Sequence, residues 1–320
     1  MILHAARLAP RLMKVIGRSA FSRAAVVIVA TLTLSACLLQ QQTAPSPTPT
    51  QTSEPTTTRP RFELATYQYA LQTKGKIRIA IRDAAVAPLA TRTAGKVEGF
   101  EADIGREIAR AIWRPNEDPE THIDWISVDD STRVSALTSN QADITIAALL
   151  ITDDAKKVID LSDTYLHTGP RLLVKKTNDT IKQLSDVASG EQTVCAVKQG
   201  RPEAELKKIT NGGAKVLELD SLEFCLQALA TGAADAVAAD ETTLFGIVSK
   251  QPNDVKIVGN RFADDNLGIG IKKTAAGDRT GFVEFVNNAL LKIVADRTWA
   301  KLYAKYLTPL TGENKQIPTD

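Results

Sequence analysis

The chain has 320 residues, of which 43% are hydrophobic and 24% charged, a composition typical of a soluble globular protein with about two domains. Its formal net charge is only +2, so electrostatics give no argument for binding nucleic acid. The charge is unevenly distributed, because the N-terminal 23 residues contain basic side chains and the first acid is Glu54. The remainder of the chain is therefore mildly acidic.

The N-terminus has the pattern of a targeting segment. Residues 24–34 form an uncharged, mostly apolar run that follows the basic stretch and leads into Leu34-Ser35-Ala36-Cys37. The run is too short to span a bilayer, which takes roughly 20 apolar residues, but it has the length of a signal-peptide core. The cysteine resembles that of the bacterial lipobox, which implies a signal peptide over residues 1–36 and a lipid anchor on Cys37. A secretory signal with a coincidental cysteine is the alternative.

A linker is expected over residues 37–60. Proline, threonine and serine dominate residues 43–60, and such a segment cannot bury enough apolar surface to fold. Its prolines favour extended polyproline II conformation. We therefore expect a spacer that holds a globular domain away from the membrane surface.

Hydrophobic periodicity in the rest of the chain predicts alternating strands and helices. Strands are expected at 76–82, 123–128, 142–150, 193–197, 215–219, 234–239, 256–258 and 267–272. Helices are expected at 100–112, 130–138, 202–209, 221–231, 241–250, 279–295 and 299–306. Strands that alternate with helices indicate parallel sheets with right-handed crossovers.

The strand–helix pattern occurs twice, which predicts two α/β lobes, each with a mostly parallel sheet flanked by helices. We expect lobe I over residues 61–171 and 262–309, lobe II over 172–261, and a tail over 310–320. Residues 171–176 and 267–272 are the expected crossing strands. Two lobes joined by two crossings form a hinged cleft, and ligands of such sheets bind at the carboxyl ends of strands near helix N-termini.

Two cysteines remain if Cys37 carries lipid. Cys195 lies in a predicted strand and Cys225 in a predicted helix. Secretion would place them in an oxidising compartment, where disulfides persist. We expect a Cys195–Cys225 disulfide, with two buried free thiols as the alternative.

Several short motifs follow one another in a specific order. They are GFEAD at 99–103, RVSAL at 133–137, ADI at 142–144, IT at 151–152, IDLSDTY at 159–165, and GAADAV at 232–237 leading to Asp240. Over residues 74–308 this order resembles family 3 of the bacterial extracellular solute-binding proteins, the receptors of polar amino-acid ABC importers, and within it the actinobacterial glutamate/glutamine-type lipoproteins. The resemblance implies a type II periplasmic-binding-protein fold whose lobes close on a ligand. It also supports the disulfide.

The resemblance implies a set of ligand-binding positions. Asp240 matches the residue that binds the ligand ammonium, although an aspartate there would also serve as a plain helix N-cap. Asp83 matches a cleft position, and its alternative is a solvated loop acid. Ala148, Leu150 and Thr152 occupy positions that contact the ligand in the family.

The sequence departs from the family pattern where a ligand carboxylate should be held. The arginine expected three residues after the threonine of the Ile-Thr motif is Ala155, and the usual aromatic positions are Val86 and Leu89. We therefore expect lobe I to have lost its cation, its hydroxyls and its aromatic cover. Arg201, where the predicted second-lobe helix begins, or Arg171, on a crossing strand, would hold the carboxylate instead. Arg201 as an exposed surface charge, or a ligand that is not a free α-amino acid, are the alternatives.

Patterns of catalytic or metal-binding residues are absent from the sequence. His122 and His167 show no spacing typical of a catalytic triad or a zinc site, and the sequence contains no phosphate-loop motif. We therefore expect a binding protein rather than an enzyme, with no cofactor and no metal. The expected partners are a small-molecule ligand, an ABC permease and, through the anchor, the outer face of the cell membrane. A sensor that signals to a membrane receptor is the alternative.

Overall fold

The computed structural model describes residues 61–312 apart from 84–87, 274–278 and 280. The expected signal peptide, Cys37, the linker and Val86 lie outside the described residues. The described residues belong to one compact unit. Within the described part of the chain, no helix has the length and apolar character needed to cross a membrane.

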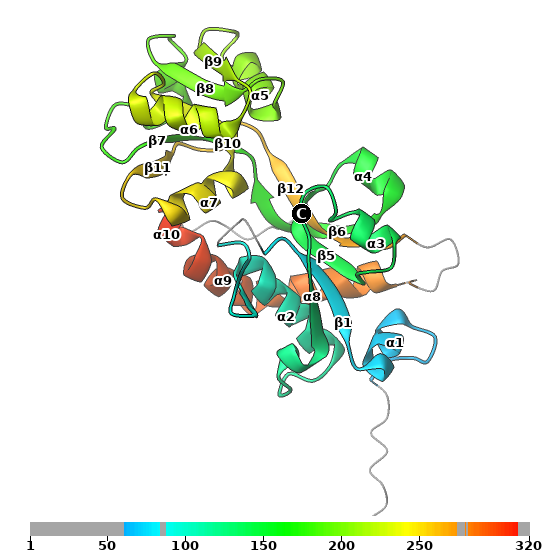
Figure 1. Cartoon of the computed structure of the whole chain (residues 1–320). Helices are drawn as coiled ribbons and strands as arrows, with labels where there is room; N and C mark the ends of the chain where they lie inside the picture. Colours follow the sequence, from blue (N-terminus) through cyan, green and yellow to red (C-terminus); the bar gives the residue numbers. More distant parts are fainter. Residues whose placement is uncertain (1–60, 84–87, 274–278, 280, 313–320) are drawn as a thin grey trace, which may run out of the picture. The chain divides into compact units, whose positions relative to one another are not determined.

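The first sheet has the strand order β4-β1-β5-β12-β6 (Figure 1). Strand β1 pairs in parallel with β4 and β5, whereas β12 runs antiparallel to β5 and β6. The strands are β1 (Ile77–Ile81), β4 (Ile123–Ser127), β5 (Ile144–Leu150), β6 (Asp160–Thr168) and β12 (Asp265–Ile271), and β2 (Thr91–Thr93) and β3 (Lys96–Glu98) form a separate hairpin. The helices that accompany this sheet are α1 (Tyr67–Lys74), α2 (Phe100–Ile112), η1 (Pro119–His122), α3 (Ser135–Thr138), α4 (Asp153–Val158), α8 (Phe282–Ala295) and α9 (Thr298–Tyr306).

The second sheet has the order β11-β7-β10-β8-β9. Strand β8 pairs in parallel with β9 and β10, whereas β7 runs antiparallel to β10 and β11. The strands are β7 (Pro170–Lys175), β8 (Thr193–Val197), β9 (Lys215–Leu219), β10 (Ala236–Asp240) and β11 (Val255–Val258). The helices are η2 (Leu184–Val187), α5 (Arg201–Ile209), α6 (Leu222–Thr231) and α7 (Glu241–Lys250). Each sheet is thus mixed, with antiparallel pairs beside the expected parallel ones.

The chain passes between the two sheets at places that differ from the expected crossing strands. It leaves the first sheet at Gly169, between β6 and β7, and returns between β11 and β12. Residues 171–176 and 267–272 therefore lie almost entirely inside β7 and β12, each within one sheet. Helix α10 (Thr308–Thr311) then packs against β11 and α7 of the second lobe, so the expected boundary at 309 falls within a helix (Figure 1).

Most predicted elements agree with the structure to within a few residues. Helix α2 buries Phe100, Ile104, Ile108 and Ile112 along one face, as its periodicity predicts. The expected helix at 130–138 is shorter, because Asp129 accepts hydrogen bonds from the backbone of Ser131 and Thr132 and holds a turn there. Strand β6, helices α1 and α4 and the β2-β3 hairpin were not predicted.

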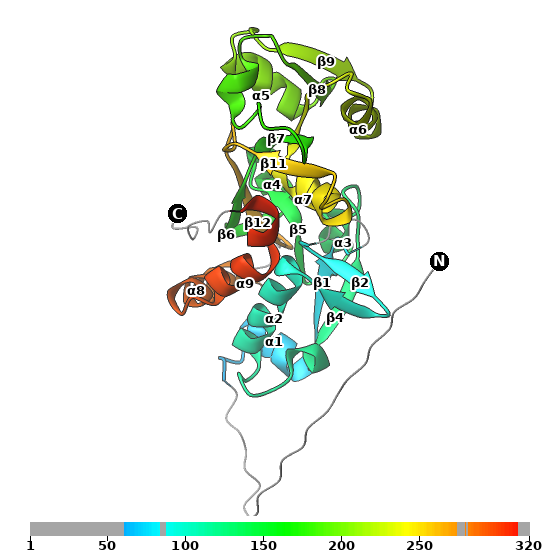
Figure 2. The same cartoon turned by 90° about the vertical axis from the view of Figure 1, so that its left-hand side faces the viewer.

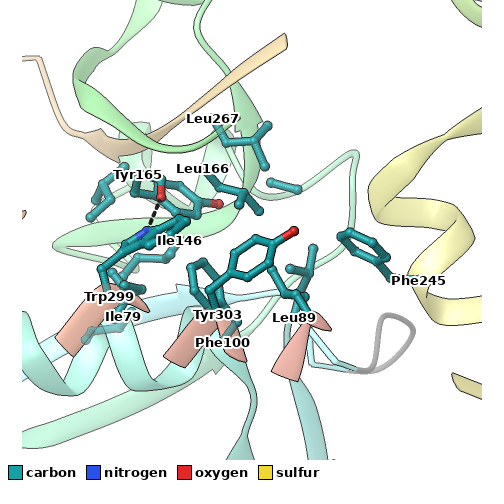
Figure 3. Packing of buried hydrophobic residues seen from close by; sticks show 14 of the residues in the cluster. Ile79, Leu89, Phe100, Ile146, Tyr165, Leu166, Phe245, Leu267, Trp299 and Tyr303 are labelled. Carbon is teal, nitrogen blue, oxygen red and sulfur yellow. Dashed lines mark hydrogen bonds between the residues drawn. The ribbon is translucent and has the colours of Figure 1, made fainter. Parts of the chain in front are cut away.

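Aromatic side chains from distant parts of the chain fill the core of the first lobe. Trp299 and Tyr303 of α9 pack on Phe100 of α2, and the Trp299 indole N–H donates to the Tyr165 carbonyl oxygen at 2.7 Å (Figure 3). Helices α8 and α9 accordingly lie beside α2 (Figure 2). In the second lobe, a Cys195–Cys225 disulfide joins β8 to α6 and confirms that prediction.

Candidate functional site: a polar pocket at the junction of the sheets

A pocket of about 170 Å³ is lined by residues of both lobes. It lies where β6 ends, β10 ends and β12 begins, close to the passage at Gly169. Strand ends of this kind are the usual ligand sites of α/β sheets. We call it the polar pocket, and its lining residues are Arg82, Asp130, Arg133, Ala148, Leu150, Thr168, Asp240, Thr242, Thr243, Asp265 and Leu267.

Two carboxyl groups from different lobes face this pocket. Asp240 ends β10, and Asp265 begins β12. Burial raises the pKa of Asp240, the neighbouring Asp265 carboxylate raises it further, and Arg201 opposes both effects. Burial also raises the pKa of Asp265, although Arg201 lowers it. The pair concentrates negative charge in a partly desolvated place, which favours a ligand ammonium group.

Two guanidinium groups of the first lobe also line the polar pocket. Arg82 follows β1, and its Nη1 lies 2.5 Å from Oδ1 of Asp130. Arg133 precedes α3, and its Nη1 lies 3.2 Å from the same oxygen and donates to the carbonyl oxygens of Ala147 and Ala148 at 2.9 and 2.8 Å. Because Asp130 is 65% exposed, this ion pair is accessible to solvent and a ligand carboxylate can compete for the arginines.

The floor of the polar pocket is a strained residue with a buried support. Ala148 has a φ of 50°, in the left-handed region that costs a non-glycine residue roughly 1 kcal/mol or more. Its N–H donates to Oε1 of Glu101 at 2.8 Å, and the Tyr165 hydroxyl donates to the same oxygen at 2.6 Å. Burial raises the pKa of Glu101, while these two hydrogen bonds lower it. The support fixes where the Ala148 carbonyl meets Arg133.

One hydroxyl group that lines the polar pocket is buried. Thr168 is 3% exposed, and its Oγ1 has no hydrogen-bond partner among the residues that the structure describes. Buried polar atoms are rarely left unsatisfied, so this oxygen marks a place where a ligand can donate or accept. Thr242 and Thr243 add two further hydroxyl groups from α7.

The comparisons with known proteins assign the chain to a family. The model of the bacterial extracellular solute-binding proteins, family 3, matches residues 77–309. The chain belongs to this family. The ABC transporter glutamine-binding protein GlnH of Bacillus subtilis is 28% identical over 74% of this chain and 83% of its own length. The glutamine-binding protein of Geobacillus stearothermophilus is 30% identical over 63% and 75%.

A solved structure supports the same assignment at the level of the fold. An ancestral arginine-binding protein bound to arginine is 30% identical, with a TM-score of 0.52, over 73% of this chain and 98% of its own. The chain therefore has the type II periplasmic-binding-protein fold of family 3, as the sequence motifs implied.

Three of the six predicted ligand-binding residues line the polar pocket of this family 3 protein. They are Ala148, Leu150 and Asp240. Asp83 lies elsewhere, buried with its carboxylate 2.6 Å from Arg92 Nε and 2.5 Å from the Ser127 hydroxyl. Thr152 is exposed and accepts from the Ala155 N–H at 3.1 Å, as the N-cap of α4.

The two arginines expected to replace the family's missing clamp have other partners. Arg201 forms an ion pair with Asp265, so it contacts a residue of the polar pocket without lining it. Arg171 is buried, and its guanidinium lies 2.8 Å from the Glu241 carboxylate. Both pairings draw the guanidinium toward a carboxylate of the chain itself.

The family's clamp arginine is absent at Ala155, but two other cations of lobe I, Arg82 and Arg133, line the polar pocket. Each carried a signal that the sequence alone contained. Arg82 is the last residue of the predicted strand 76–82, and strand carboxyl ends are where ligands bind. Arg133 begins the RVSAL motif.

Within the described residues, no group of histidine, cysteine or acidic side chains has a metal-binding arrangement.

Proposed function

We propose that the chain is an extracytoplasmic receptor that binds a small polar amino acid, of the glutamine, glutamate or aspartate type, for an ABC importer. The observation that carries the proposal is the distribution of charge in the polar pocket. Asp240 and Asp265 suit the ammonium group of a zwitterion, and Arg82 and Arg133 suit its carboxylate. The names of the glutamine-binding relatives agree with this ligand class.

A sensor role was attractive because the usual clamp arginine is absent at Ala155. The arginines of the polar pocket remove that reason, so import is the function we favour.

Anchoring through Cys37 belongs to the same proposal. Cys37→Ala is expected to release the protein from the membrane fraction into the medium, and a variant that stays membrane-bound would contradict the anchor.

Calorimetric titration of the purified full-length chain with the twenty amino acids tests the proposal. We expect at least one polar amino acid to bind with micromolar affinity. Asp240→Asn keeps the shape of the side chain but removes the charge that faces the ammonium group, and it should weaken binding on the order of a hundredfold. Wild-type protein that binds none of the twenty would overturn the proposal of an amino-acid receptor.

A further inference from the structure

Charged side chains line the polar pocket, and the pairs that they form decide how much charge is left for a ligand. Together with Arg201, which pairs with Asp265, they comprise three guanidinium groups and three carboxylates, so their formal charges cancel. The charged lining residues are Arg82, Asp130, Arg133, Asp240 and Asp265. A zwitterion whose side chain is uncharged leaves this balance intact, whereas an acidic amino acid adds one negative charge.

Asp130 reduces the positive charge that the first lobe presents to a ligand. Its Oδ1 lies 2.5 Å from Nη1 of Arg82 and 3.2 Å from Nη1 of Arg133. One carboxylate therefore compensates one of two guanidinium charges, and the remainder matches a single ligand carboxylate. Glu101, beneath the floor, does not add to this remainder, because burial favours its neutral form by raising its pKa and its anion would lower the sum further.

Asp240 supplies the matching negative charge from the second lobe. It is the N-cap residue of α7, but its side chain makes no capping hydrogen bond, so its carboxylate does not serve as the plain helix cap that the sequence allowed. The charge of Asp265 is already compensated by Arg201. The six charged groups therefore provide one site for an α-carboxylate and one for an α-ammonium group, and they leave no further charge for a ligand side chain.

Hydroxyl groups provide polar contacts for an uncharged ligand side chain. Thr168 is buried, and its Oγ1 has no hydrogen-bond partner among the residues that the structure describes. Thr242 and Thr243 line the same pocket. A hydroxyl group can both donate and accept, which suits the NH₂ and carbonyl groups of an amide. A carboxylate can only accept, and it would enter this partly desolvated place without a cation.

We propose that Asp130 makes the polar pocket selective for amino acids with an amide side chain, glutamine or asparagine, over glutamate and aspartate. Because Asp130 compensates one guanidinium charge, the second carboxylate of an acidic ligand meets no free cation and is repelled by Asp130 itself. Asp130 is thus a specificity-determining residue that acts through its charge. This inference rests on the proposed function and narrows its ligand class.

Calorimetric titration of the full-length chain at pH 7 with glutamine, glutamate, asparagine and aspartate tests the inference. Each amide has nearly the size of its acid, so the ratio of their affinities reports the effect of charge. We expect the wild type to bind the amide on the order of tenfold or more tightly than the corresponding acid. Asp130→Asn keeps the shape of the side chain and frees the second guanidinium charge, so it should lower this ratio by about fivefold or more. The ratio compares two ligands of one preparation, so partial unfolding of the variant does not change it.

Asp130→Glu keeps the negative charge and should retain the preference for the amide. Asp124→Asn is the matched control, because Asp124 is a first-lobe carboxylate that pairs with Lys76 at 3.2 Å and does not line the polar pocket. Its ratio should equal that of the wild type.

Acidic amino acids that bind the wild type as tightly as their amides would overturn this inference and leave the proposed amino-acid receptor standing. A ratio that Asp130→Asn leaves unchanged would do the same, and so would binding confined to amino acids other than these four. Wild-type protein that binds none of the twenty amino acids would overturn the proposed function as well.

Discussion

Glu101 lies beneath the polar pocket without lining it, yet it determines the shape of the floor. Its Oε1 accepts from both the Ala148 N–H and the Tyr165 hydroxyl, and these bonds offset the cost of the left-handed Ala148 backbone. The carboxyl group is 1% exposed, and burial raises its pKa above the ordinary value of 4.5. A buried acid whose protonation affects stability therefore lies beneath the polar pocket.

Glu101→Gln should change how stability depends on pH. A carboxyl with a raised pKa holds its proton more tightly in the folded state, so the wild type loses stability as pH rises from its ordinary pKa through the folded value. Glutamine cannot ionise and so does not lose stability in this way. Over that pH range, the free energy of unfolding of the variant should rise relative to that of the wild type by roughly 1.4 kcal/mol for each pKa unit of the shift. Urea denaturation at pH 5 and at pH 8 measures the difference.

Tyr165→Phe is the companion variant, because it removes one hydrogen bond that lowers the pKa of Glu101 and keeps the ring. The pH range over which this variant loses stability should therefore extend to higher pH than in the wild type. Denaturation curves whose pH dependence is the same in the wild type and in both variants would contradict the role given to Glu101.

The residues of the polar pocket were only partly predictable from the sequence. The order and spacing of the family motifs pointed to three of them, Asp240, Ala148 and Leu150. Arg133 and Asp265 reach the polar pocket from segments more than 100 residues apart, and their encounter depends on how β5 and β12 pair. Arg201 lies at a helix start, as predicted. Its ion-pair partner, Asp265, is 64 residues further along the chain, so the sequence did not reveal this pairing.

Secondary-structure elements were easier to predict than their ends. Helix α6 begins after Ser221, which accepts from the Phe224 N–H at 3.3 Å, and ends at Gly232 with a φ of 84°, both as the residue types predict. Helix α4 has only six residues and buries none of them, so it lacks the apolar periodicity that reveals longer helices. Its signal was the capping residue Thr152, which the resemblance assigned to the ligand instead.

Thr152→Ala should therefore affect stability more than binding. The variant loses the hydrogen bond from the Ala155 N–H that caps α4, and loss of an N-cap costs about 1 kcal/mol. Because Thr152 does not line the polar pocket, amino-acid affinity should stay within about twofold of the wild type. Thr152→Ser restores the cap and serves as the control. A hundredfold loss of affinity in the alanine variant would instead indicate that Thr152 contacts the ligand.

The disulfide links strand β8 to helix α6. Its closure spans 30 residues, for which the chain-entropy model gives a stabilisation of roughly 3–4 kcal/mol. A variant with Cys195→Ala and Cys225→Ala should unfold at a correspondingly lower urea concentration, and dithiothreitol should have no further effect on it. Reductant should lower the urea concentration at which the wild type unfolds, to about that of the variant. Equal stability of the oxidised wild type and the double variant would contradict this contribution.

The two lobes meet through charges as well as through the connecting chain. Arg201 begins α5 of the second lobe, and Asp265 begins β12 of the first sheet, so their ion pair crosses the junction at which the polar pocket lies. The same guanidinium lowers the pKa of both Asp265 and Asp240, the two carboxyl groups that are expected to hold the ammonium group. Arg201 thereby favours the charged forms of both carboxyl groups, although it does not itself line the polar pocket.

Arg201→Ala separates this role from the direct carboxylate clamp that the sequence suggested. Without Arg201, the pKa values of Asp240 and Asp265 should rise further, so acid should release the ligand at a higher pH than in the wild type, while affinity at pH 8 should fall by less than about tenfold. Calorimetric titration between pH 4.5 and pH 8 with the best-binding amino acid measures both effects. Lys198→Ala is the control, because it removes the exposed pair with Asp220 from the same lobe and should leave the profile unchanged. Loss of affinity by a hundredfold or more at pH 8 would show instead that Arg201 binds the ligand carboxylate itself, because removing a charged partner that contacts the ligand costs several kcal/mol at every pH.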